Sequence, residues 1–187
     1  GSTQNGGRGR YLDGTGASRT GITPPGQVAS WVAPLFFDPN NQMTVYSLGT
    51  KVHKSIDFGT TWIDLGTPTT FGGGTISTGA IAENNSNIMV VTSGSSIELS
   101  TDGGVTFSNI KNSLPSNTIT DVAFDPNDDA TMIVTYDTYQ NNGQKVYITT
   151  NSGLTWQNIT YNLGNMPIYC VAIDQTDDST IYVGAAV

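Results

Sequence analysis

The sequence predicts an all-β fold in which four-stranded antiparallel sheets follow one another around an axis, as the blades of a β-propeller do. The main observation is a pattern, Ser-x-Asp-x-Gly-x-Thr-Trp, that begins at Ser55 and returns in altered form at Ser100 and Thr149. Its third positions, 57, 102 and 151, lie 45 and 49 residues apart, and a period of this length is typical of repeat architectures. The apolar runs are short, rich in Val, Ile, Tyr and Thr, and bounded by Gly, Asn, Asp or Pro, which favours strands over helices.

Each period predicts the same strands in the same order. A first strand ends in an acid and a turn, and these acids stand at Asp38, Glu83, Asp125 and Asp174. Second strands are expected at 43–48, 88–93, 131–136 and 180–183, third strands at 51–54, 97–99 and 145–148, and fourth strands at 62–65 and 156–159. Four antiparallel strands in each period are typical of a propeller blade.

The repeated pattern is expected to shape the turn between the third and fourth strands. Asp and Asn side chains accept backbone hydrogen bonds in turns, Gly relieves the conformational constraint, and the aromatic residue covers the adjacent apolar layer. Asn151 keeps the acceptor and loses the charge, which indicates a folding role for this position. The residues assigned to these turns are Ser55, Asp57, Gly59, Thr61 and Trp62, then Ser100, Asp102, Gly104, Thr106 and Phe107, then Asn151, Gly153, Thr155 and Trp156.

The chain is interpreted as one propeller segment with about three full blades and a blade divided between its ends. Residues 1–29 are expected to carry the outer part of a blade, residues 30–75, 76–117 and 118–167 three blades, and residues 168–187 the inner strands of a further blade. The two halves either meet and close a small ring or belong to a larger propeller. We favour the larger propeller, completed by a longer parent chain or by self-association, because about four blades is the lower limit of the known range.

Composition excludes several functions. The 15 acidic residues against 7 basic ones give a formal net charge of −8, which disfavours nucleic acid as a partner. The apolar runs are too short to cross a bilayer. A single cysteine, Cys170, rules out an intrachain disulfide, and its apolar neighbours predict a small buried side chain. Little lysine and abundant Thr, Ser and Asn suggest a protein that is secreted or displayed at the surface of a bacterium.

The three copies of the repeated pattern are called boxes from here on. Together with the Asp-Pro-Asn turns before them, they resemble the Asp-box, or BNR-repeat, propellers. That superfamily includes sialidases, xyloglucanase-type glycoside hydrolases, sortilin-like receptors and photosystem-assembly propellers. The resemblance covers about residues 30–187. The start, Gly1-Ser2-Thr3-Gln4-Asn5-Gly6, is also similar to the Gly-x-Gln-Asp-Asn-Gly segment of secreted bacterial sortilin-like propellers, although the Asp is absent. The resemblance implies the propeller fold and leaves the function open, because function lies in sites grafted onto folds.

The candidate catalytic residues are few. A sialidase would need three arginines from different blades, whereas Arg8, Arg10 and Arg19 lie close together near one end, where we expect them to solvate the N-terminal segment or to pair with Asp13. Glycoside hydrolysis needs two carboxyl groups across a sugar. Most acids here belong to boxes or turns. Asp121, which begins a first strand, and Asp137, in the insertion 136–140, are the acids that remain of most interest, although a solvated loop is the simpler account of Asp137.

No cofactor and no metal site is predicted. His53 is the single histidine, and it occupies the strand position that Glu98 and Tyr147 take in the other blades, which indicates an ordinary strand residue. Calcium at the acidic turn 125–129 is conceivable, but the spacing does not match an EF-hand loop, so turn formation is the simpler account.

The leading hypothesis is an extracellular binding or scaffolding module for a carbohydrate or a protein. Its expected contact residues are the aromatic side chains of Trp31, Tyr136, Tyr139 and Tyr169, together with the loops. The alternative is one part of a xyloglucanase-like glycoside hydrolase that acts on polysaccharide, with the second catalytic acid elsewhere in a longer protein. The chain alone is more simply explained without catalysis.

Overall fold

The computed structural model describes residues 7–11, 18–31, 33–139, 143–177 and 179–186. It confirms the all-β fold of four-stranded antiparallel blades. The initial segment 1–6, whose sequence resembles sortilin-like propellers, lies outside the described residues, as do Asp13 and Gln140. In the part of the chain that is described, no helix is long and apolar enough to span a membrane.

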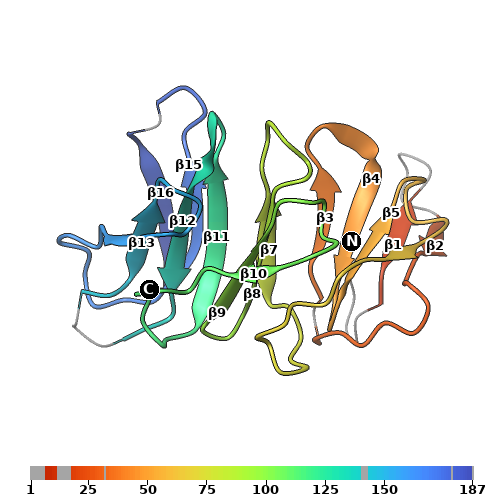
Figure 1. Ribbon diagram of the computed structural model, residues 1–187, viewed down its shortest axis with the longest axis horizontal. Coiled ribbons are helices and arrows are strands. Elements are labelled where there is room, and N and C mark those ends of the chain that lie inside the picture. The colour runs from red at the N-terminus through yellow and green to blue at the C-terminus, as the bar shows by residue number, and fades with distance from the viewer. Residues whose placement is uncertain (1–6, 12–17, 32, 140–142, 178, 187) are drawn as a thin grey trace.

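Three complete blades and two half-sheets make up the fold. The first blade contains β3 (Leu35–Asp38), β4 (Asn41–Leu48), β5 (Val52–Ser55) and β6 (Ile63–Asp64); the second, β7 (Thr78–Ile81), β8 (Met89–Ser93), β9 (Ser96–Ser100) and β10 (Ser108–Asn109); the third, β11 (Ile119–Asp125), β12 (Asp128–Tyr136), β13 (Val146–Thr149) and β14 (Gln157–Asn158). Within each blade the strands pair in chain order. The N-terminal half-sheet is β1 (Gly9–Tyr11) with β2 (Arg19–Gly21), and the C-terminal half-sheet is β15 (Ile168–Ile173) with β16 (Ile181–Ala185). Figure 1 shows the sheets side by side in a row, with the two half-sheets toward opposite ends.

The hydrophobic core lies between neighbouring sheets. One cluster joins the first and second blades through residues such as Tyr46, Ile76 and Phe107. A second joins the second and third blades, and a third packs the third blade against the C-terminal half-sheet. The middle strands β4, β8 and β12 are therefore buried on both faces over most of their length. Their Val, Ile, Met and Tyr residues suit this double burial.

Strand register repeats from sheet to sheet. The residue after each fourth strand donates its backbone N–H to a carbonyl at or near the start of the third strand, as in Leu65 to Val52, Ile110 to Ile97 and Ile159 to Val146. Ile22 donates to Arg8 in the same way, at 3.0 Å between nitrogen and oxygen. The N-terminal half-sheet therefore has the register of third and fourth strands, and the C-terminal half-sheet that of first and second strands.

Cys170 is a correction to the sequence interpretation, because its side chain is exposed. It lies on the face of β15 that carries Tyr169 and Ala172, which are also exposed, whereas Ile168, Val171 and Ile173 on the other face pack against the third blade. An apolar neighbourhood in sequence predicted burial, but only one face of this half-sheet is covered among the described residues.

Candidate ligand-binding site

Hydrogen bonds within each box fix the turn between the third and fourth strands of its blade. In the second box, Asp102 Oδ1 accepts hydrogen bonds from the backbone N–H groups of Val105 and Thr106, and Asp102 Oδ2 accepts one from the hydroxyl of Thr106 at 2.6 Å. The hydroxyl of Ser100 donates to Asp102 and accepts from the N–H of Gly104. The first box repeats these bonds around Asp57. Both carboxylates are thus engaged within their own turns.

Hydrogen bonding keeps the box carboxylates ionised. Bonds from the backbone and side chain of Thr61 lower the pKa of Asp57 to about 2, and those from Thr106 do the same for Asp102. In the third box, Asn151 Oδ1 accepts from the N–H of Thr155, and Asn151 Nδ2 donates to the Thr155 hydroxyl at 2.8 Å. The threonine hydroxyl that donates to an aspartate in the other boxes accepts here, so the turn forms without a charge.

Each box also joins its blade to the preceding sheet. The Cα of Gly153 lies against Ile110, where an added Cβ would approach within 2.7 Å, and Gly59 lies equally close to Ile22. The indole N–H of Trp156 donates to the carbonyl of Ile110 at 2.8 Å. Phe107 packs in the core between the first and second blades. The box residues therefore shape turns and joints between blades.

Asp121 is held at the junction of three sheets. Its carboxylate accepts hydrogen bonds from the N–H of Val122 at 3.0 Å and of Val171 at 3.1 Å, and a longer one from the Thr78 hydroxyl. Burial raises the pKa of Asp121, and the backbone bonds oppose that shift. A raised pKa is one property of a general acid. The oxygens, however, are committed to residues of the second blade, the third blade and the C-terminal half-sheet.

Asp137 lies at a polar hollow of about 430 Å³. The hollow is lined by Ser116, Asn117, Thr118, Asp137, Thr138 and Tyr139. Two contacts position the segment that follows β12. The N–H of Asp137 donates to the carbonyl of Thr118, and the buried ammonium of Lys145 donates to the carbonyl of Thr138 at 2.6 Å. Tyr139 keeps 67% of its surface exposed, so an aromatic face, a carboxylate, hydroxyls and an amide meet at one open surface.

The other aromatic residues proposed as contacts lie apart from this hollow. Trp31 is exposed before β3, and Tyr169 is exposed on β15. Tyr136 is a correction, because its side chain is 0% exposed and packs edge-on to the ring of Tyr147, with centroids 5.8 Å apart. It ends the doubly buried strand β12, so it supports the core and presents no face to a ligand.

The arginines also lie differently from what the sequence predicted. Arg8 is buried and donates to the carbonyl of Leu48 at 2.9 Å. Arg10 donates to the carbonyls of Asp57 and Phe58, and its guanidinium lies 5.9 Å from the centroid of the Phe58 ring. Both were expected to solvate the N-terminal segment or to pair with Asp13, and both instead bond to backbone carbonyls of the first blade. Arg19 lies on the exposed strand β2.

The third-strand position that His53 shares with Glu98 and Tyr147 points into the structure. His53 Nδ1 lies 2.8 Å from Asp64 Oδ1, and desolvation lowers the pKa of His53 although Asp64 opposes this. Glu98 is fully buried and accepts from the N–H groups of Thr69 and Thr70, contacts that the sequence did not reveal.

Among the described residues, no three His, Cys, Asp or Glu side chains gather as a metal site would require. In the turn after β11, the oxygens of Asp125 and Asp128 accept bonds from the turn itself.

Comparison with known proteins supports this architecture. The family model described as Sortilin, neurotensin receptor 3 (Sortilin-Vps10) matches residues 33–185. No curated protein sequence matches the chain. Solved structures are similar in fold, with TM-scores of 0.72 for the GH74 enzyme of Niastella koreensis, 0.74 for the GH74 xyloglucanase of Xanthomonas campestris and 0.70 for YCF48 of Cyanidioschyzon merolae.

Identity to these structures is low, at 24%, 16% and 14% in the same order. The matches cover 99%, 98% and 99% of this chain. They cover only 31% of each GH74 chain and 62% of YCF48. The chain thus spans about a third of the length of the GH74 enzymes and less than two thirds of YCF48, as a segment of a larger propeller would.

Proposed function

The chain belongs to the Sortilin-Vps10 family, and from this premise we propose that it is an extracellular bacterial β-propeller module that binds a polysaccharide without cleaving it. The observation that carries the proposal is the hollow at the end of β12, which the exposed Tyr139 and the acidic Asp137 both line. Sugar-binding sites combine an aromatic face, which packs on the ring, with a few polar groups that fix its orientation. The hydroxyls of Ser116 and Thr118 and the amide of Asn117 supply such groups.

Binding without cleavage is the simpler chemistry for this hollow. A glycosidase sets two carboxyl groups across the scissile bond, at roughly 5 to 10 Å from each other. Asp137 is the one carboxylate among the residues that line the hollow. Asp121, the other acid of interest, accepts backbone hydrogen bonds at a junction of sheets and is not among the lining residues.

The second candidate is one part of a glycoside hydrolase. It is favoured by the fold similarity to the GH74 xyloglucanase of Xanthomonas campestris, of which the chain covers 31%. In that case a second acid would come from blades outside this chain, across the sugar from Asp137. The two candidates differ in whether the chain by itself releases reducing ends from a polysaccharide.

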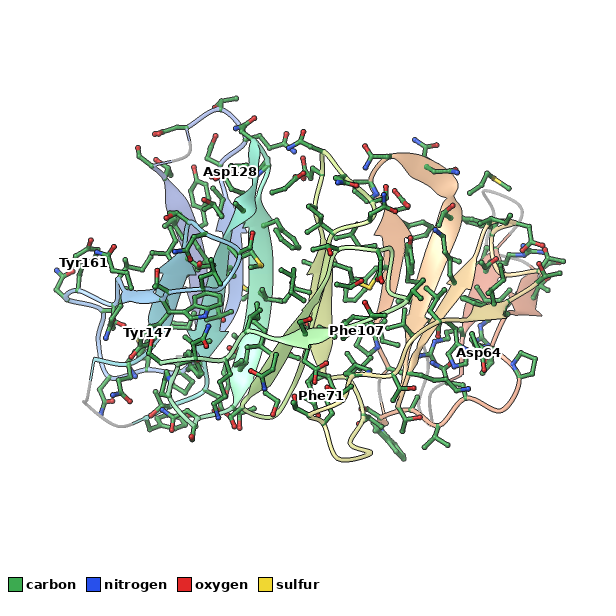
Figure 2. All side chains as sticks on the ribbon, viewed as in Figure 1. Asp64, Phe71, Phe107, Asp128, Tyr147 and Tyr161 are labelled. Atoms are coloured by element: carbon green, nitrogen blue, oxygen red, sulfur yellow. The ribbon has the colours of Figure 1, made fainter. Side chains whose placement is uncertain are left out.

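Affinity gel electrophoresis in xyloglucan and in hydroxyethyl cellulose tests the proposal. We expect the migration of the 187-residue chain to be retarded by at least one of these polysaccharides. Tyr139→Ala should weaken the interaction by about tenfold, because an exposed aromatic anchor contributes on the order of 1 to 2 kcal/mol. Tyr161→Ala is the matched control, since Tyr161 is 83% exposed, projects from the molecule (Figure 2) and does not line the hollow.

Two outcomes would overturn the proposal. Unretarded migration in both gels would exclude these polysaccharides as ligands and favour a protein partner. Release of reducing sugar by the purified chain, lost on Asp137→Asn, would replace binding with hydrolysis.

A further inference from the structure

We infer that the hollow at Tyr139 selects an acidic sugar, a hexuronate, whose carboxylate is held by Lys111 and Ser116 while its ring hydroxyls face Asp137. The inference rests on the proposed function, because it names the class of sugar that this same hollow takes. The residues that line the hollow all lie in the described part of the chain. The placement of charged groups around the hollow carries the inference.

Basic side chains are scarce beyond the first blade. The chain has 7 lysines and arginines, and after Lys54 only Lys111 and Lys145 remain, whereas most of the 15 acidic residues lie in the same span. Both of these lysines donate hydrogen bonds to residues that line the Tyr139 hollow. The positive charge of the second and third blades is therefore concentrated at one site.

Lys111 reaches the hollow through Ser116. It follows β10, and its ammonium donates to the hydroxyl of Ser95 at 3.0 Å and to the hydroxyl of Ser116 at 3.3 Å. An ammonium carries three N–H donors, so one of them remains for a ligand in the described chain. Because Ser116 Oγ accepts from Lys111, the hydroxyl hydrogen of Ser116 is left to donate as well. A charged N–H and an adjacent O–H suit the two oxygens of a carboxylate.

Neither lysine has a carboxylate partner in the part of the chain that the structure describes. The ion pairs there are all made with Asp64, in the first blade. Lys145 has 1% of its surface exposed, and its ammonium donates to the carbonyl of Thr138. Desolvation lowers the pKa of Lys145, and no carboxylate opposes that shift. Cations without a partner favour an anion in the adjacent hollow.

Asp137 supplies a charge of the opposite sign. Its backbone N–H donates to the carbonyl of Thr118, but its carboxylate makes no hydrogen bond or ion pair with the other described residues. Asp137 and Lys111 are thus not paired with each other, although both serve the same hollow. Sugar hydroxyls are donors that such a carboxylate accepts. A hexuronate satisfies both charges, with its carboxylate at Lys111 and its hydroxyls at Asp137.

This arrangement disfavours the other classes of sugar. A neutral sugar would leave the Lys111 ammonium with hydroxyl partners alone, and an amino sugar would place a second cation beside it, where like charges repel. The ring of Tyr139, which is 67% exposed, can pack on the apolar face of any of these sugars. Tyr139 therefore contributes affinity, and Lys111 contributes the preference for an acid.

Calorimetric titration with trigalacturonic acid and with its methyl ester tests the inference, because esterification removes the charge and keeps the sugar ring. We expect the acid to bind more tightly than the ester at low salt. Lys111→Gln should weaken the acid by about two- to fivefold, the range for an exposed ion pair, with little effect on the ester. Arg19→Gln is the matched control, since it removes the same charge from the exposed strand β2, away from the hollow. Tyr139→Ala should weaken both ligands.

Equal affinity for the acid and the ester would overturn the inference, as would a Lys111→Gln chain that keeps the full preference for the acid. Binding that Tyr139→Ala leaves unchanged would place the acid outside this hollow and overturn it too. The same titration with trimannuronic acid distinguishes two sources of hexuronate, and tighter binding of either acid than of its ester supports the inference. Circular dichroism of each variant confirms that the fold is retained.

The two proposals fail separately. A chain that xyloglucan retards and that shows no preference for the acid would overturn only this inference. A chain that neither neutral polysaccharide retards and that binds neither trimer would overturn the proposed function as well.

Discussion

The joint between Gly153 and Ile110 gives the sharpest test of how the boxes stabilise the fold. Gly153 has a φ of +81°, and a Cβ at this position would lie 2.7 Å from the Cβ and 2.8 Å from the Cδ1 of Ile110. Gly153→Ala should therefore carry two costs. The left-handed backbone costs about 1 to 2 kcal/mol for a residue with a side chain, and forcing a methyl group into a packed contact costs about 1 to 3 kcal/mol.

A matched control separates these two costs. Gly94 also has a positive φ, +56°, but an added Cβ there would meet nothing within 4 Å. Gly94→Ala should lower the free energy of unfolding by the backbone term alone, about 1 to 2 kcal/mol. The excess of Gly153→Ala over Gly94→Ala then measures the contact with Ile110. Combining Gly153→Ala with Ile110→Ala should remove only part of that excess, because alanine removes the Cδ1 and Cγ1 contacts but keeps the Cβ that lies 2.7 Å from the added methyl group.

The assay is urea unfolding followed by tryptophan fluorescence, to which Trp156 contributes from its contact with the Ile110 carbonyl. The free energy of unfolding in water is obtained by linear extrapolation for each variant. The reasoning is refuted if Gly153→Ala and Gly94→Ala differ by less than about 0.5 kcal/mol, which is within the error of additivity. In that case Ile110 would yield to the new methyl group, and the glycine would be required for its backbone conformation alone.

The carboxylates make two further predictions. The pKa values of Asp57 and Asp102, lowered to about 2 in the folded state, mean that their contribution to stability is complete above the unfolded value of about 3.9 and is lost as the pH falls through about 2. Urea unfolding between pH 7 and pH 2 should show this loss of stability. Asp102→Asn, which copies Asn151, should retain the fold and make the free energy of unfolding less dependent on acid pH. The same pH dependence in this variant as in the unchanged chain would contradict the stabilising role of the Asp102 carboxylate. Asp121→Ala should lower the free energy of unfolding by about 1 to 3 kcal/mol, because two backbone N–H groups lose their acceptor. Asp121→Asn keeps an acceptor oxygen and should cost less in the same urea unfolding. Equal losses for the two variants would show that these hydrogen bonds do not stabilise the fold.

The parts of the fold that the sequence predicted are those fixed by nearby residues. The bonds of the second box join Ser100 and Asp102 to residues two to four positions away. The turn after β11 is likewise held by Asp125 and Asn127. Such contacts form whatever the neighbouring blade contains, so a pattern of residue types is enough to identify them. The strand order then follows from the regular spacing of the turns.

The features that the sequence did not reveal depend on residues far apart in the chain. Arg8 is fixed by Leu48, 40 positions away, and Glu98 by Thr69, 29 positions away. Tyr136 is buried because sheets pack on both sides of β12, and no local pattern distinguishes it from the exposed Tyr139.

The separation of folding residues from candidate binding residues follows from the antiparallel strands. The third box contacts the start of β12, where the N–H of Ser152 donates to the carbonyl of Ala130 at 2.9 Å, whereas Asp137 follows the other end of β12. The box and the turn that carries Asp128 (Figure 2) thus lie at one end of the third blade, and the Tyr139 hollow lies at the opposite end. Because hydrogen bonds within the box depend little on the distant loop, changes at Tyr139 should alter binding with little effect on stability. Changes at the box should do the reverse, which explains how one repeated turn can support unrelated activities across a superfamily.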